Sequence, residues 1–125
     1  VVRLLLENGA DVNIQGGIYG NALQAASTAR QLTAVELLLE HGADVNKQGG
    51  YYCNALVAAS FEGQLEIVQL LLEHGADVNA QGGYYSNALQ TASWAGRLEV
   101  VVLLLRNGAD INAKGGRYGN ALQAA

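Results

Sequence analysis

The residues that could do chemistry recur at fixed places along the chain. A Gly-Gly pair followed by tyrosine occurs in QGGIYG, QGGYYC, QGGYYS and KGGRYG, which begin at residues 15, 48, 81 and 114. Glycine-rich loops can bring backbone N–H groups close to a phosphate, so nucleotide binding is the first chemistry to consider. The loops lack the glycine spacing of a dinucleotide fingerprint, and no GxxxxGK[ST] motif is present. We therefore expect no nucleotide and no cofactor.

The side chains that could bind a metal or carry out catalysis do not form a convincing set. His41 and His74 lie one repeat period apart, and Asn8 and Asn107 hold the same place in other units, so we expect no metal site. Cys53 has no histidine or basic run near it in the sequence. The remaining candidates are glutamates typical of a solvated helix face and serines next to small alanines: Glu36, Glu40, Glu66, Glu73 and Glu99, and Ser27, Ser60 and Ser93. We expect no catalytic residues and no enzyme activity.

Composition narrows the class of protein further. The 125 residues are half hydrophobic, and seven basic residues face eleven acidic ones for a net charge of −4. This balance argues against a broad surface for nucleic acid or anionic membrane. No apolar run approaches the ~20 residues of a membrane span. The single cysteine, Cys53, excludes an internal disulfide, so we expect an intracellular protein, cytoplasmic or nuclear. Val1 falls inside an apolar helical pattern, so we expect that the natural start is missing.

The chain is built from a sequence repeat, and any functional site must be positioned by the repeated units. GAD and NAL each recur every 33 residues. A fixed period of this length predicts stacked units rather than one globular core. The chain then divides into a half unit (1–14), full units (15–47, 48–80 and 81–113) and a second half unit (114–125).

Each unit carries two helical segments. In NALQTAS, Asn87 stands at the N-cap and Gln90 three residues later, so we expect a capping box in which Gln90 reaches back. Val57 breaks this pattern in the middle unit. In LEVVVLLLRNGAD, apolar residues at helical spacing mark a buried face, and Gly108 stands where the helix must end in a left-handed residue. A β-branched residue, Gly-Gly and tyrosine then predict a hairpin-like connection.

The first full unit departs from the others. Arg30 replaces the glycine of the turn between helices, and Ala34 stands where Ile67 and Val100 occur in the later units. We expect this unit to pack least well.

The pattern resembles the ankyrin repeat. GQLEIVQLLLEHGADVN, residues 63–79, is similar to that family's second-helix consensus, and the period is the family's own. The first-helix phrase differs, with NALQ in place of the usual Thr-Pro-Leu-His. The resemblance implies an all-α solenoid of helix-turn-helix units with short β-hairpin-like connections. The variant GGxYGNALQAAS also looks like repeats in large arrays of filamentous-fungal proteins, some of which follow a NACHT-type nucleotide-binding domain.

Comparison of the units separates two kinds of position. The Gly-Gly pair, the tyrosine and the asparagine are identical in every unit, so we interpret them as scaffold. Columns that vary are candidates for contact with a partner, because ankyrin-like arrays line one concave face with hairpin tips and first helices. These candidates are Ile18, Tyr51, Cys53, Phe61, Glu62, Tyr84, Ser86, Trp94 and Arg117. We expect Tyr51, Phe61, Tyr84 and Trp94 to form one aromatic patch. The alternative is that Phe61 and Trp94 only cover helix ends.

The resemblance implies a non-enzymatic protein-binding module that works through rigid display. We expect a protein partner, no nucleic acid, no membrane, and a monomeric isolated array. The alternative function is a structural or regulatory spacer attached to a signalling NTPase or another enzyme domain.

Overall fold

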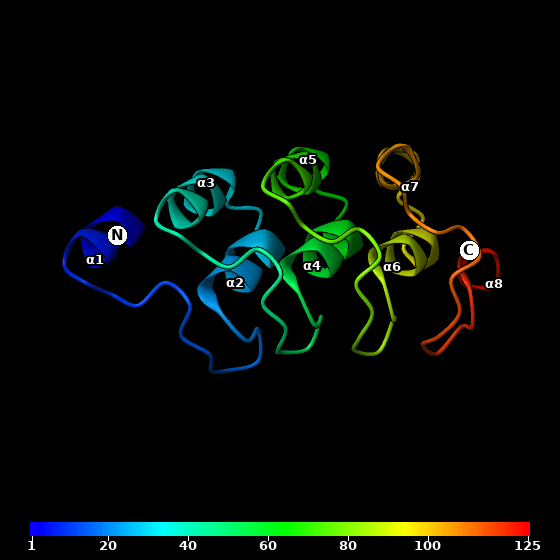
Figure 1. Cartoon of the computed structure of the whole chain (residues 1–125), viewed down its shortest axis with the longest axis horizontal. Helices are drawn as coiled ribbons and strands as arrows, with labels where there is room; N and C mark the ends of the chain where they lie inside the picture. The colour runs from blue at the N-terminus through cyan, green and yellow to red at the C-terminus, as the bar shows by residue number, and fades with distance from the viewer.

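The helices of the protein stand in one row. The computed structural model describes residues 1–125. The helices are α1 (Val2–Glu7), α2 (Ala22–Thr28), α3 (Leu32–Glu40), α4 (Ala55–Glu62), α5 (Leu65–Glu73), α6 (Ala88–Trp94), α7 (Leu98–Arg106) and α8 (Ala121–Ala124). The first helices of successive units, α2, α4, α6 and α8, pack side by side, and so do the second helices α1, α3, α5 and α7 (Figure 1). The predicted all-α solenoid is confirmed.

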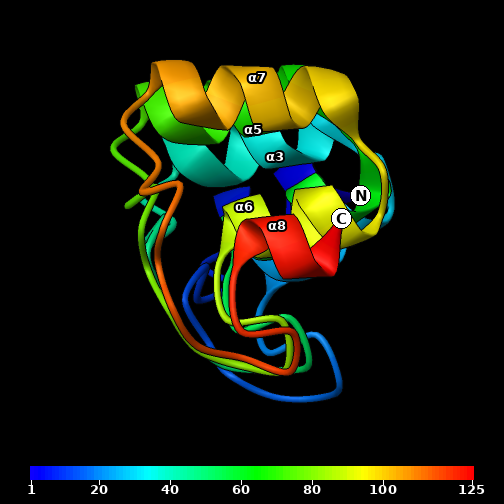
Figure 2. The same cartoon turned by 90° about the vertical axis from the view of Figure 1, so that its right-hand side faces the viewer.

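The cross-section has two helical layers and a projecting arm. Figure 2 looks along the row and shows α3, α5 and α7 above α6 and α8, while the connections sweep away from the helices and hook back toward them. The hooked connections and the first helices therefore share one inner side of the molecule. No helix has the length and apolar character that crossing a membrane requires.

Asparagine begins each first helix. The Asn87 side chain accepts a hydrogen bond from the backbone N–H of Gln90 at 2.8 Å, with Asn87 itself in extended backbone. Asn21, Asn54 and Asn120 do the same for the residue three places on. The predicted asparagine cap is confirmed, and it satisfies one N–H that the first turn leaves without a partner.

Glycine ends each second helix. Gly108 has φ +89°, and the N–H of Ala109 donates to the carbonyl of Leu104 at 3.0 Å, which closes a Schellman motif. The turn between helices also needs positive φ: Gly63 has φ +69° and Arg30, at the same place, has φ +62°. Arginine in this region is strained by roughly 1–2 kcal/mol, whereas glycine is not.

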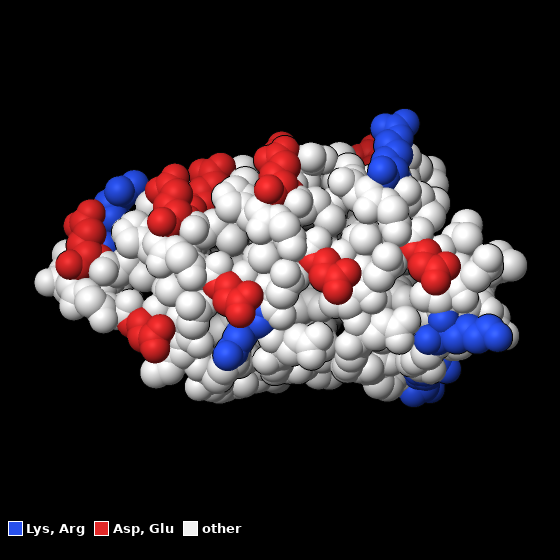
Figure 3. Space-filling model, in the orientation of Figure 1, with Lys and Arg blue, Asp and Glu red and all other residues white.

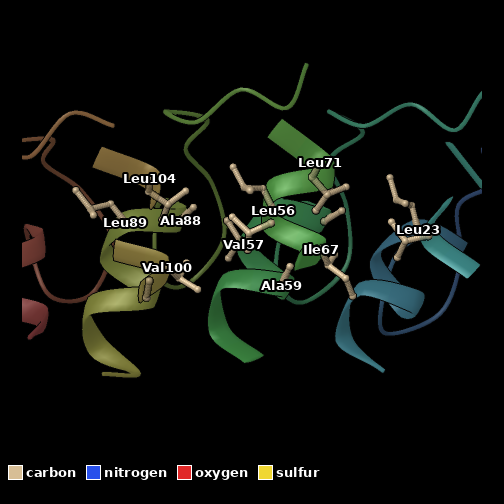
Figure 4. Close-up of a cluster of buried hydrophobic side chains, with 14 of the residues drawn as sticks. Leu23, Leu56, Val57, Ala59, Ile67, Leu71, Ala88, Leu89, Val100 and Leu104 are labelled. Atoms are coloured by element: carbon tan, nitrogen blue, oxygen red, sulfur yellow. The ribbon is translucent and has the colours of Figure 1, made fainter. Parts of the chain in front are cut away.

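The core runs between the two helical layers (Figure 4). Second-helix residues such as Ile67, Leu71 and Leu104 are almost completely buried and pack with first-helix leucines such as Leu56. Each buried side chain of this size contributes roughly 1.5–3 kcal/mol. Ala34 is only half-buried and fills less of the same layer in its own unit.

The connections are narrow hairpin-like loops. The N–H of Gly82 donates to the carbonyl of Ser86 at 2.7 Å, and the other loops close in the same way. Gly50 has φ +66° and lies directly against the backbone of Tyr19 and Gly20 in the preceding loop. A Cβ at Gly50 would clash with that backbone, so the loops stack because glycine stands there.

Candidate interaction surface

Aromatic rings form a continuous row between the loop tips and the ends of the first helices. Phe61, in the last turn of α4, stacks on Trp94, in the last turn of α6, with ring centroids 5.8 Å apart. Tyr85 lies beside both, at 5.9 Å from Phe61 and 5.2 Å from Trp94. We call the connected rings the aromatic row; its members are Tyr51, Tyr52, Phe61, Tyr84, Tyr85, Trp94 and Tyr118.

The tyrosine column holds the row together. The Tyr51 ring connects to Phe61 through the Tyr52 ring, and its hydroxyl also lies beside Tyr85. The Tyr84 ring connects to Trp94 through the Tyr85 ring. The four variable aromatics therefore do not form a patch by themselves. Ring pairs at these separations add about 0.5–1.5 kcal/mol each beyond the burial of their area.

The row has a buried middle and an exposed edge. Tyr85 is buried, whereas Trp94 and Tyr84 are each 41% exposed and Tyr51 is 51% exposed. Phe61 and Glu62 are half-buried, and Ile18 is exposed. Large aromatic faces that are half accessible and held by neighbouring rings are suited to contact with another protein.

The surroundings change the acidity of two tyrosines. Burial first, and then the neighbouring Tyr51 hydroxyl, raise the pKa of Tyr85 to about 12. Burial first, and then the Glu62 carboxylate, raise the pKa of Tyr52. Both phenols are therefore neutral at physiological pH and act as hydrogen-bonding, apolar groups.

Arg117 closes one end of the row. Its guanidinium carbon lies 5.2 Å from the Tyr84 ring centroid and 5.9 Å from that of Tyr118. Its backbone N–H also donates to the carbonyl of Tyr84 at 3.2 Å, as that of Tyr51 does to Ile18 at 2.9 Å. Candidate positions in successive loops are thus joined through the backbone, and Arg117 covers part of Tyr84 with a cation.

Cys53 and Ser86 require a correction, because both side chains are buried rather than displayed. Both are less than a tenth exposed, and their φ angles are +75° and +77°, where Gly20 and Gly119 stand in the other loops. Each lies beneath the glycine pair of the next unit: the Cys53 Sγ contacts Gly82, and Ser86 contacts Gly116. Burial also raises the pKa of the Cys53 thiol. These residues fill space between loops and are unavailable to a partner.

The glutamines that follow the helix cap also require a correction. The predicted reach back to the asparagine N–H is wrong: the Nε2 of Gln24 donates forward, to the carbonyls of Cys53 at 3.1 Å and Lys47 at 3.4 Å. Gln90 does the same to Ala113 and Gly119. The N–H groups of Asn87 and Asn120 instead donate locally, to the carbonyls of Tyr85 at 3.1 Å and Tyr118 at 3.0 Å. The glutamine is a link between units.

Asparagine of the GADVN phrase forms a second link, which the sequence reasoning missed. The Nδ2 of Asn46 donates to the carbonyl of Gly75 at 3.1 Å, and its Oδ1 accepts from the N–H of Asp77 at 2.7 Å. Asn13 and Asn79 make the same pair of bonds to the unit that follows them. The signal was available, since asparagine stands at this place in every unit.

The repeating units match a known family model. The family model described as ankyrin repeats (3 copies) matches residues 1–82 and 48–115. The chain belongs to the ankyrin-repeat family. No curated protein matches it. Ankyrin repeats generally act as protein–protein interaction modules and are typically non-catalytic.

The histidines of this ankyrin array have a structural role at helix ends. The Nδ1 of His41 lies 2.8 Å from the carbonyl oxygen of Leu37, and that of His74 lies 2.9 Å from Leu70. A carbonyl only accepts, so Nδ1 carries the proton and donates. Asn8 makes the equivalent bond to Leu4. Both kinds of side chain thus add a second donor to a last-turn carbonyl that already accepts the backbone N–H of the same residue. No group of His, Cys, Asp and Glu gathers as a metal site.

Proposed function

We propose that this ankyrin array binds a protein partner along the exposed edge of the aromatic row. The observation that carries the proposal is the half-exposed stack of Trp94 on Phe61, flanked by Tyr51 and Tyr84. The rings are held by one another and by the loops, so little side-chain entropy is lost when a partner binds. The proposed contact residues are Ile18, Tyr51, Phe61, Glu62, Tyr84, Trp94 and Arg117.

The first full unit supplies matched substitutions for a test. Trp94→Thr introduces the residue that stands at Thr28, and Tyr51→Ile introduces the residue at Ile18. Affinity capture from a lysate, quantified by mass spectrometry, should enrich a partner with the original chain and lose it with the double variant. Truncation of central aromatic residues typically weakens an interface by about 2 kcal/mol or more.

A control separates loss of contact from loss of fold. Glu36→Gln changes an exposed residue of α3 and should leave capture unchanged. The thermal unfolding of Phe61→Ala with Trp94→Ala is measured in parallel. A collapse of stability in that variant would show that these rings are core. Unchanged capture by Trp94→Thr with Tyr51→Ile would contradict the proposed surface.

A second proposed role is that of a spacer or sensor within a larger signalling protein. The phrase GGxYGNALQAAS, which resembles repeats of fungal arrays that follow NACHT-type domains, supports this proposal. In that setting the division into units 15–47, 48–80 and 81–113 would set the span of the array. Reading the coding sequence on both sides is the test. An attached NTPase or other enzyme domain would support the accessory role, and flanking repeats alone would not.

We further propose that the array acts inside the cell and is monomeric when isolated. The buried free thiol of Cys53 is compatible with a reducing compartment. Sedimentation of the isolated chain would check the monomeric state.

A further inference from the structure

A groove lies on the outer side of the molecule, between α5 and α7. Its volume is about 610 Å³. The floor and walls come from Leu65, Leu98, Val102 and Leu103 together with Gln69. Leu98 is 73% exposed, and Leu65 and Val102 are each more than a third exposed. This surface is separate from the aromatic row, which lies at the loop tips and first-helix ends.

The groove is apolar because the last full unit differs from the earlier ones. Val102 stands where α5 has Gln69 and α3 has Glu36. Arg106 stands where α5 has Glu73 and α3 has Glu40. Figure 3 shows the change along the upper edge of the molecule, where the groups over α3 and α5 are acidic and a basic group appears over α7 beside a partly hidden acidic one. The same backbone therefore presents a polar, acidic surface between α3 and α5 and an apolar one between α5 and α7.

The walls of the groove decide which backbone conformation can enter it. Both walls are helices, whose backbone groups along the groove are already paired within the helix. An extended peptide would leave its own N–H and C=O groups without partners against this apolar surface. A helix satisfies its own backbone and can place side chains between the ridges of α5 and α7.

The charged residues at the two ends of the groove favour one direction for a helix bound in it. Glu66 and Glu99 lie in the first turns of α5 and α7, and Arg106 lies in the last turn of α7. All three are exposed and line the groove. Glu99 and Arg106 are separated by about 10 Å along the helix axis at 1.5 Å per residue. A helix stabilises itself with acidic residues in its first turn and basic residues in its last. Those charges match the groove when the helix runs antiparallel to α7.

We propose that the α5–α7 groove binds a short amphipathic helix of another protein, antiparallel to α5 and α7. Its apolar stripe covers Leu65, Leu98 and Val102. Its acidic first turn lies beside Arg106, and its basic last turn lies beside Glu66 and Glu99. The nine-residue length of α7 sets the length of the contact.

The probe is a synthetic peptide tested against the full chain. It is a fluorescein-labelled, alanine-based peptide of about twelve residues, held helical by a side-chain lactam because free helices of this length are marginal. It carries two glutamates in the first turn, leucines along one stripe and two lysines in the last turn. Fluorescence anisotropy should show saturable binding. A peptide with the glutamates and lysines exchanged should bind about threefold more weakly, as expected for exposed charge pairs.

Two variants place residues of the preceding unit in the groove. Val102→Gln should weaken peptide binding about tenfold through the lost apolar contact. Arg106→Glu, which leaves the apolar surface intact, should weaken it about threefold. Glu36→Gln, on α3, is the control and should have no effect. Circular dichroism confirms that each variant is folded.

The outcomes separate the possible occupants. No saturable binding, or equal binding by Val102→Gln, overturns the proposal. Equal binding of the charge-exchanged peptide overturns the antiparallel occupant. Sedimentation equilibrium tests a second copy of the chain in the groove. A concentration-dependent dimer that Val102→Gln abolishes would assign the groove to self-association instead.

Discussion

At the scale of single residues, the glutamine after the helix cap shows how a local pattern can mislead. Asn87 and Gln90 have the spacing of a capping box, and the asparagine half of that motif is present. The glutamine instead donates to the carbonyl of Ala113, at the end of its own unit, and to that of Gly119, in the next unit. Sequence spacing describes one helix at a time, so it could not show a partner in the following unit.

Removal of the hydrogen bonds made by the Gln90 side chain should destabilise the fold. We expect Gln90→Ala to lower the free energy of unfolding by about 1–3 kcal/mol, because the part-buried Ala113 carbonyl loses its side-chain donor and the Gly119 carbonyl keeps only the Gly115 N–H. Gln123→Ala, at the same column but exposed, is the control and should change stability by less than ~0.5 kcal/mol. Urea unfolding measures both. Equal effects of the two substitutions would count against the link.

Tyr85 should make stability fall in alkaline solution. Its pKa is raised to about 12 in the folded chain from 10.0, so the unfolded chain loses this proton first. The contribution of the neutral Tyr85 phenol to the free energy of unfolding is fully present below about pH 10 and is lost as the pH rises to about 12. Chemical unfolding at a series of pH values should show this decline. The decline should be smaller in Tyr85→Phe, and an identical pH profile for that variant would contradict it.

The comparison of units predicted part of the candidate surface from the sequence. It identified Phe61 and Trp94 as neighbours, and the structure places their rings 5.8 Å apart. It could not show that Cys53 and Ser86 are covered, since variation between units is compatible with both exposure and filling of space. Their burial depends on the glycine pair of the next loop, a contact between units that no local pattern records.

At the scale of elements, helix boundaries followed from the sequence because caps are local. The asparagine starts and glycine ends lie where the spacing predicted them. The fold of the loops was less predictable, because each loop rests on the backbone of its neighbour, as Gly50 does on Tyr19. The sequence did indicate where backbone strain would occur, because Arg30 stands in a turn where the other units have glycine.

Relief of this strain should stabilise the first full unit. We expect Arg30→Gly to raise the free energy of unfolding by up to about 1 kcal/mol, since glycine adopts φ +62° without a steric penalty. Differential scanning calorimetry should show a higher Tm. Arg30→Ala also removes the side-chain contact with the Glu62 carbonyl but keeps a Cβ, so it should not stabilise. A Tm for Arg30→Gly at or below that of the original chain would contradict the account.

At the scale of the whole molecule, stability should be greatest in the middle of the row. α1 has no buried residue and α8 has four residues, whereas α4 buries most of its length. Each unit is stabilised mainly by contact with its neighbours, so the outer helices are held from one side only. We expect residues 1–13 and 119–125 to exchange amide hydrogens first and α4 and α5 last, as measured by mass spectrometry. Uniform protection along the chain would contradict this.

The asparagine links have a consequence for how such a chain can change over generations. Asn13, Asn46 and Asn79 bind only main-chain atoms of the following unit, a glycine carbonyl and an aspartate N–H. Because these hydrogen bonds involve only main-chain atoms of the neighbouring unit, they do not depend on which side chains that unit carries. A gene segment encoding one unit can therefore be duplicated, deleted or exchanged for another in steps of 33 residues, with these hydrogen bonds preserved on both sides. Recombination could then assemble new combinations of display surfaces without first redesigning the scaffold.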